Sequence, residues 1–276
     1  MAIVGSERRS LARYLVLGLL FFLYGIPILY LVVTSFKAAS EIPVTPAAVV
    51  FTPLLDSVRA VWDDALWTAA KNSAYIAFGT AIVVVGLATP AAYGLARMRS
   101  GRILSFLLFS LIVLQMVPQA NSVIPLLRVL VRLDLLGSRL GIIFALSALL
   151  LPFAVIILRP FFASLPPETI EAARLDGASE LAIFYRIAIP LARNGIATIA
   201  VLVWILGWGE FLYSVSFLPK TDLLPMSALM SLQVSSEGVR WGPLMALAMF
   251  TALPIVAVFI ATQRLLATGL TLGAVK

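Results

Sequence analysis

The sequence contains no cysteine and no histidine among its 276 residues. Their absence excludes disulfides, thiol nucleophiles, zinc sites built from Cys and His, and acid–base catalysis by imidazole. Charge is also scarce, because 12% of the residues are charged, whereas a soluble globular chain has about 25%. The composition therefore excludes most enzyme classes, and it excludes a chain whose whole surface faces water.

Apolar residues take the place of charge: 62% of the residues are hydrophobic, and the mean hydropathy is +1.06. A helix needs about 20 apolar residues to cross a hydrocarbon core of roughly 30 Å. Six stretches of this order lack charge, except that the fifth contains Glu210. They predict an all-α polytopic membrane protein with one transmembrane domain over residues 1–276. The six spans are expected at approximately 14–36, 74–96, 103–127, 140–158, 195–218 and 242–263.

The distribution of lysine and arginine predicts the orientation of these spans. Six spans place both termini on one side of the membrane, and cytoplasmic segments carry an excess of Lys and Arg. With both termini cytoplasmic, the inner segments hold twelve of the 20 basic residues and the outer segments hold eight. Arg128, Arg132 and Arg139 share one outer loop against this rule. The net charge of +7 favours anionic lipid over nucleic acid as a partner.

Prolines inside the apolar stretches predict that the helices are not all straight, because a proline lacks the N–H that a helix uses and its ring clashes with the preceding turn. They either only shape the bundle or mark broken helices that line a path. Amides on both sides of Pro118 favour the second interpretation, since polar groups at membrane depth must face protein or water. The prolines concerned are Pro27, Pro90, Pro118, Pro152 and Pro254.

The longest predicted cytoplasmic segment runs from Arg159 to Arg193 and has the pattern of two short helices. Ser164 and Pro167 suit the start of the first helix, and Gly177 can end it in a left-handed conformation. Ser179 can begin the second helix, which Pro190 is expected to end. The sequence therefore predicts a helical hairpin over 164–191.

The segment from Arg159 to Arg193 carries balanced charge, with four arginines, its two end residues included, and four acidic residues. A neutral segment does not suit binding to anionic lipid. Its second helix has an apolar face at helical spacing, made of Leu181, Phe184, Ile187 and Ala188. Such a face favours a groove on a protein partner, with Phe184 as the aromatic anchor. We expect Glu171 to brace the loop through its carboxylate. The alternative is that the loop only packs on the inner ends of its own bundle.

At these residues the sequence resembles the permease subunits of bacterial ABC importers for carbohydrates, in particular the shorter maltose-type permease. The loop is similar to the EAA loop of that family. Further similarities lie at Thr34-Ser35-Phe36-Lys37, Asn72-Ser73, Arg159-Pro160-Phe161-Phe162, Gln263-Arg264, Gly269-Leu270-Thr271 and Gly273-Ala274-Val275-Lys276. The resemblance implies that the loop carries a coupling helix that docks into an ATPase subunit. The residues concerned are Glu171, Ala172, Ala173, Asp176, Gly177, Ala178, Phe184, Ile187 and Pro190.

The resemblance also implies a complex in the bacterial cytoplasmic (inner) membrane. It comprises a second homologous permease subunit, two ATP-binding subunits and an external sugar-binding protein, which would meet the outer loops Ala38–Ala70 and Lys220–Trp241. ATP and magnesium would be held by the ATP-binding subunits, so this chain has no cofactor and is not itself an enzyme. The absence of a Gly-x-x-x-x-Gly-Lys-Ser/Thr motif agrees with this division.

A sugar offers hydroxyls and flat C–H faces, which amides, carboxylates and aromatic rings can contact. On this basis the predicted substrate path consists of Gln115, Gln119, Asn121, Trp208, Glu210 and Tyr213. The sequence departs from the family pattern close by, because Gly209 stands before Glu210 where an asparagine is common.

Two other functions compete with the importer. An ion-coupled secondary transporter subunit would place ionisable groups inside the membrane, and Glu210 is the one candidate. An intramembrane enzyme would need a nucleophile with a base, or a metal site. The sequence has neither His-Glu-x-x-His nor Gly-x-Ser-x-Gly, which argues against it.

Overall fold

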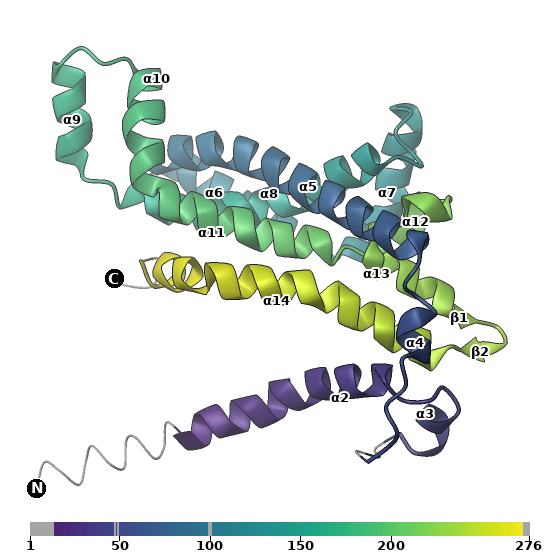
Figure 1. Ribbon diagram of the computed structural model, residues 1–276. Helices are drawn as coiled ribbons and strands as arrows, with labels where there is room; N and C mark the ends of the chain where they lie inside the picture. The colour runs from purple at the N-terminus through teal and green to yellow at the C-terminus, as the bar shows by residue number, and fades with distance from the viewer. Residues whose placement is uncertain (1–13, 47, 49, 99–100, 273–276) are drawn as a thin grey trace, which may run out of the picture. The chain divides into compact units, whose positions relative to one another are not determined.

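The structure is a computed structural model that describes residues 14–46, 48, 50–98 and 101–272, with side chains described as far as Gln263 (Figure 1). Several residues that enter the predicted orientation lie outside the described residues: Arg8, Arg9, Arg13, Arg99 and Lys276. The last C-terminal motif of the family resemblance, 273–276, also lies outside them. The location of the two termini therefore stays a prediction.

The predicted all-α membrane fold is confirmed. Five helices are long and apolar enough to cross a membrane, and their ranges are Tyr14–Ser35, Asp64–Arg97, Arg139–Ala163, Glu180–Trp208 and Trp241–Gln263. The second and third of these are α5 (Asp64–Arg97) and α8 (Arg139–Ala163), and the last belongs to α14 (Trp241–Leu272). In the described part of the chain, the strands β1 (Val234–Ser235) and β2 (Gly238–Val239) form the one sheet, an antiparallel pair.

The stretch predicted as a single span over 103–127 is divided into two helices. These are α6 (Arg102–Gln115) and α7 (Gln119–Arg132), and their axes are bent by 96°. Pro118 lies at the break in an extended conformation, with φ −61° and ψ 139°. Proline disfavours the helical region for the residue before it, so Val117 cannot easily continue α6 into α7. Counting this pair as one span gives six spans.

The other prolines do not break their helices. Pro90, Pro152 and Pro254 lie inside α5, α8 and α14, which continue past them. Pro27 lies in the first turn of α2 (Ile26–Ser35), directly after a π-helical turn over Phe21–Gly25. For these four prolines the structure favours the interpretation that they only shape the bundle.

The described residues form two compact units. The first ends at Leu66 and also contains Met230–Ala252, and the second comprises Trp67–Leu229 and resumes at Leu253. The helix α14 contributes to both. The predicted single domain over 1–276 stays a prediction.

The first unit contains α2, the short helices α3 (Glu41–Val44) and α4 (Asp56–Arg59), the β1–β2 pair and the start of α14. The loop that follows α2 is held at the end of this helix by Lys37, which is 2% exposed. The Lys37 ammonium donates to the carbonyl of Pro46 at 2.9 Å and lies 5.5 Å from the centre of the Phe51 ring. A buried cation needs such partners, because leaving it unpaired is costly.

The second unit holds the remaining helices. Its core is an apolar cluster between α5, α7, α8 and α12 (Leu212–Phe217), with the stacked rings of Tyr213 and Phe217 among its buried residues. The helix α11 (Ile189–Trp208) approaches α5 closely, because a Cβ on Gly207 would lie 2.9 Å from the Cα of Ala77. The short helix α13 (Met226–Leu229) contacts α12.

Candidate functional site

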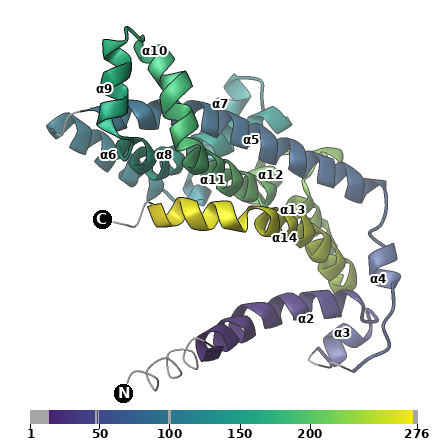
Figure 2. The ribbon, with the colours of Figure 1, turned by 60° about the vertical axis from the view of Figure 1, so that its left-hand side comes forward.

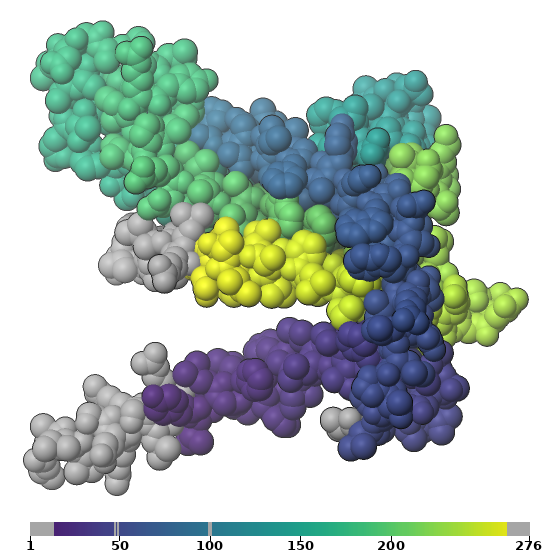
Figure 3. All heavy atoms as spheres, in the orientation of Figure 1, coloured from purple at the N-terminus to yellow at the C-terminus, as the bar shows by residue number. Residues whose placement is uncertain are grey.

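The predicted helical hairpin exists and projects beyond the ends of α5, α8 and α11 (Figure 1, Figure 2). Its first helix, α9, spans Pro167–Leu175, and its second begins as α10, Glu180–Ile183. The hairpin also stands out in the space-filling view (Figure 3). It therefore presents a surface of its own at one end of the second unit.

The turn between α9 and α10 is built around Gly177. This residue has φ +80°, and its N–H donates to the carbonyl of Arg174 at 3.0 Å. The N–H of Ala178 donates to the carbonyl of Ala173 at 2.9 Å. These two bonds form a Schellman motif, which uses carbonyls that the end of a helix leaves unpaired. The left-handed conformation predicted for Gly177 is confirmed.

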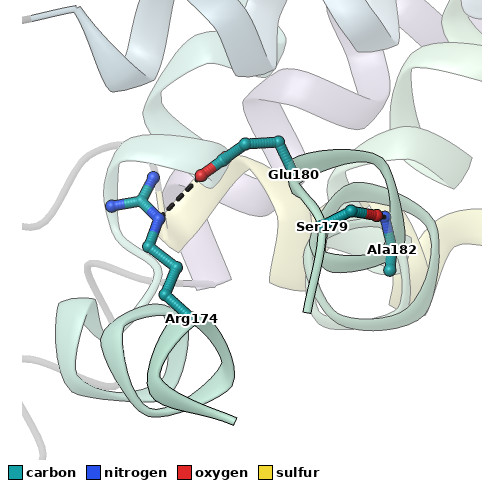
Figure 4. Close-up of polar contacts among 4 residues, drawn as sticks. All are labelled: Arg174, Ser179, Glu180 and Ala182. Carbon is teal, nitrogen blue, oxygen red and sulfur yellow. Dashed lines mark hydrogen bonds and ion pairs between the residues drawn. The ribbon is translucent and has the colours of Figure 1, made fainter. Parts of the chain in front are cut away.

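Ser179 begins the second helix, as predicted: its hydroxyl accepts from the N–H of Ala182 at 3.2 Å (Figure 4). The prediction that Pro190 ends this helix is wrong. The chain continues from Glu180 to Trp208 through a π-helical turn over Phe184–Ala188, in which the N–H of Ile189 bonds to the carbonyl of Phe184. Pro190 lies two residues after this π-helical turn, and the local change of hydrogen-bond spacing lets the helix continue past it. The hairpin is therefore joined to a membrane helix without a break.

The ion pair across the hairpin turn is made by Glu180 and not by Glu171. The Nε of Arg174 donates to Oε1 of Glu180 at 2.7 Å (Figure 4). The hydrogen bond to Glu180, together with the charge of its carboxylate, raises the pKa of Arg174 above its ordinary value. Glu171 is exposed, and within the described residues it makes no ion pair. The described contacts therefore give Glu171 no bracing role, and the carboxylate that spans the turn is that of Glu180.

We expect Glu180→Gln to keep membrane abundance and solute uptake within about twofold of the wild type, because exposed ion pairs contribute little and are screened by salt. Both side chains are largely exposed, at 45% for Arg174 and 63% for Glu180. The measurement is uptake normalised to the amount of chain in the membrane, at low and at high salt. A loss of uptake greater than about tenfold at both salt concentrations would contradict this expectation.

Phe184 attaches the hairpin to the bundle. Its ring centre lies 5.1 Å from that of Tyr93 on α5, and Tyr93 also contacts Phe162 on α8, at 5.6 Å. Ile170 on α9 and Ile183 on α10 are fully buried. The side of the hairpin that carries Phe184 therefore packs on its own chain.

Other apolar side chains of the hairpin remain uncovered. Leu175, Leu181 and Tyr185 are 89%, 70% and 61% exposed. The sequence pattern includes Leu181 in the apolar face but misses Leu175 and Tyr185. The exposure of Leu175 could have been predicted from its position. It immediately precedes the predicted Asp176-Gly177 turn, and a side chain beside a turn has few neighbours to cover it. Exposed large apolar groups at a projecting tip are typical of an interaction surface.

The structure brings together three of the six residues predicted to line the substrate path. Glu210 is 5% exposed, and its carboxylate accepts from the Nε2 of Gln119 at 2.9 Å and from the N–H of Tyr213 at 2.6 Å. The hydroxyls of Tyr213 and Ser122 are hydrogen-bonded at 2.5 Å. Ser122 is a member of this cluster that the sequence pattern does not identify.

A groove of about 360 Å³ follows the bend between α6 and α7 along α8. Its polar lining comes from Asn121, Ser122 and Tyr213. Gln115 is exposed and donates to the carbonyl of Leu149, which also lines the groove. Trp208 lies elsewhere, stacked on Trp204 with ring centres 5.3 Å apart. In the described part of the chain no group of three acidic residues is arranged to hold a metal ion.

Residues 88–271 match the family model described as binding-protein-dependent transport system inner membrane component. This match covers more than half of the chain. The chain belongs to this family. It is thus a permease subunit of an ATP-driven (ABC) importer and a multi-pass protein of the bacterial inner membrane, and the permease is not itself catalytic.

Individual proteins agree with this assignment. The permease is 30% identical to the arabinooligosaccharides transport system permease protein AraQ of Halalkalibacterium halodurans, over 92% of each chain. It is 37% identical to the osmoprotective compounds uptake permease protein GgtD of Synechocystis, over 74% of the permease and 69% of that protein. The crystal structure of a bacterial ABC transporter that imports the acidic polysaccharide alginate matches with a TM-score of 0.75 at 22% identity. That match covers 94% of the permease and 97% of the other chain, and it supports the fold.

Proposed function

We propose that this permease forms, with a second homologous permease subunit, the translocation path for a sugar or sugar-like solute. ATP hydrolysis on two separate ATP-binding subunits, which hold ATP and magnesium, would drive transport. An external sugar-binding protein would deliver the solute to the outer loops. The substrate class is supported by the similarity to the arabinooligosaccharides transport system permease protein AraQ.

One observation carries the coupling part of this proposal: the α9–α10 hairpin projects with exposed apolar side chains and is continuous with α11. A partner can shift the spans only through a contact whose free energy differs between two states. Leu175 and Leu181 offer apolar area for such a contact. Because the helix from Glu180 to Trp208 is unbroken, a movement of the hairpin is transmitted along its length.

We further propose that the substrate path from this chain follows the groove at the bend of α6 and α7. Irregular backbone at membrane depth is tolerated where it lines a cavity, and broken helices border the substrate sites of many transporters. Asn121 and Gln115 are exposed beside this bend and offer amides to hydroxyl groups. Tyr213 backs the same groove as a fully buried side chain.

ATP, rather than an ion gradient, is expected to drive uptake. The complex, purified through a tag on this chain and reconstituted in vesicles with its binding protein, should accumulate labelled arabino-oligosaccharides when ATP is enclosed. Protonophore and sodium ionophore should leave this accumulation unchanged, since Glu210, the one intramembrane carboxylate, is already engaged by Gln119 and Tyr213.

Glycine betaine serves as the non-sugar comparison in the same vesicles. Uptake of betaine but not of the oligosaccharides would overturn the substrate class and keep the energy source. Accumulation that collapses with the ionophores while ATP remains would favour the ion-coupled alternative. Vesicles with a hydrolysis-deficient ATP-binding subunit provide the baseline.

A further inference from the structure

Two helix breaks that are far apart in the sequence meet in the second unit. One lies between α6 and α7 at residues 116–118, and the other separates α11 from α12 at residues 209–211. Glu210 stands in the second break, and its side-chain bond to Gln119 joins positions 91 residues apart. Gln119 is the first residue of α7, so this bond reaches the start of the helix that follows the first break.

The carboxylate of Glu210 is committed to the protein itself. Its Oε1 accepts from the N–H of Tyr213, in the first turn of α12, and its Oε2 accepts from Gln119. The carbonyl of Glu210 accepts from the hydroxyl of Ser227. With the residue 5% exposed, neither oxygen is presented to the groove. A buried carboxylate must be satisfied in this way because an unpaired one is strongly destabilising.

The hydrogen bonds of Glu210 also position side chains that line the groove. The carboxylate fixes the start of α12. Tyr213, the second residue of α12, pairs its hydroxyl with the hydroxyl of Ser122 on α7. Tyr213 and Ser122 both line the groove, together with residues of α8. Glu210 therefore holds the two helix starts whose side chains form the polar wall of the groove, without lining the groove itself.

We propose that Glu210 is a positioning residue that ties the start of α7 to the start of α12, and not a ligand for the solute or for a coupling ion. The consequence of this tie, the shape of the substrate path, rests on the proposed function. The tie itself is a property of this chain. Loss of the tie frees α7 to move away from the core.

A reciprocal exchange of the two side chains tests the tie. Gln119→Glu alone places two carboxylates against each other and should break it. Gln119→Glu combined with Glu210→Gln restores one carboxylate–amide pair, because the amide introduced at position 210 can accept from the N–H of Tyr213 while it donates to the carboxylate introduced at position 119. Glu210→Ala removes both acceptors and should also break it. A solute ligand or ion site at Glu210 would not be restored by moving the charge to position 119.

The absence of cysteine in the chain allows a single-cysteine readout. Val123 lies on α7 and packs against the apolar core, so Val123→Cys reports whether α7 leaves that core. We expect maleimide to label this cysteine roughly tenfold faster in Glu210→Ala and Gln119→Glu, because a buried hydrogen-bonded pair is lost. In the exchanged pair the labelling rate should return to within about twofold of the parent. Arg102→Cys, at an exposed position in the first turn of α6, is the control whose rate should not change.

Uptake by the whole complex is measured on the same variants and should follow the labelling. Unchanged labelling of Val123→Cys in both single variants would overturn the proposal, as would an exchanged pair that labels as fast as Gln119→Glu. If Glu210→Ala does not accumulate in the membrane, the comparison of Gln119→Glu with the exchanged pair decides alone. The labelling needs no solute and no ATP, so failure of the proposed function would leave its result intact.

Discussion

Replacing Gly177 by valine is expected to reduce transport to less than about a tenth of the wild-type rate while the chain stays in the membrane, because a β-branched residue at positive φ is a conformational outlier. Gly177 has φ +80°, and a Cβ there would meet no other atom within 4 Å. The penalty is therefore one of backbone conformation. It would open the Schellman turn and change the angle between α9 and α10.

Three measurements on each variant separate loss of coupling from loss of folding: the amount of chain in the membrane, the amount of ATP-binding subunit that copurifies, and uptake. Gly177→Asn is the permissive variant, since asparagine tolerates the left-handed region. Gly86→Val is the matched control, because Gly86 also has open space around it but no positive φ. Normal copurification and normal uptake in Gly177→Val would refute the role assigned to the hairpin turn.

Gly207→Val should have a different effect, namely loss of the chain from the membrane. A Cβ at this position would lie 2.9 Å from the Cα of Ala77, and Ala77 is fully buried. Since backbone cannot yield as a flexible side chain does, the α5–α11 contact must separate. Overpacking of this kind costs roughly 1–3 kcal/mol or more.

The measurement for Gly207→Val is membrane abundance, together with the temperature at which the purified complex loses its ATP-binding subunits. Gly207→Ala should give a smaller decrease in both, and Gly86→Val should give none. A Gly207→Val protein with normal abundance and normal thermal resistance would show that the close approach of α5 and α11 is not required. The contrast with Gly177→Val is that one glycine serves packing and the other serves conformation.

The corrections to the predicted hairpin show what a local pattern lacks. Local rules predict that Pro190 stops the second helix, but a π-helical turn over Phe184–Ala188 precedes that proline and the helix continues to Trp208. Glu171 was expected to brace the loop, but Arg174 faces Glu180 across the turn. In both cases the chemical preference of the residue is correct. The observed contact differs because it depends on the path of the backbone beyond the local segment.

Features that depend on composition and on near neighbours can be predicted from the sequence alone. The uncharged apolar stretches specify the membrane-spanning helices, because the cost of burying charge in lipid acts on each stretch independently. The turn at Gly177 follows from hydrogen bonds that reach only five residues back, from Ala178 to Ala173. The resemblance carried by the loop and its neighbouring motifs likewise pointed to the family to which the chain belongs.

Which distant groups meet depends on how the helices pack. That Glu210 bonds to Gln119, that Tyr213 joins Ser122, and that Phe184 lies against Tyr93 depends on contacts between helices separated by dozens of residues. The pattern of apolar residues places such groups on helices, but it leaves the rotation and bend of each helix open, including the 96° bend at Pro118. These are settled by packing, because a buried polar group takes whichever partner the packed helices bring within hydrogen-bonding distance.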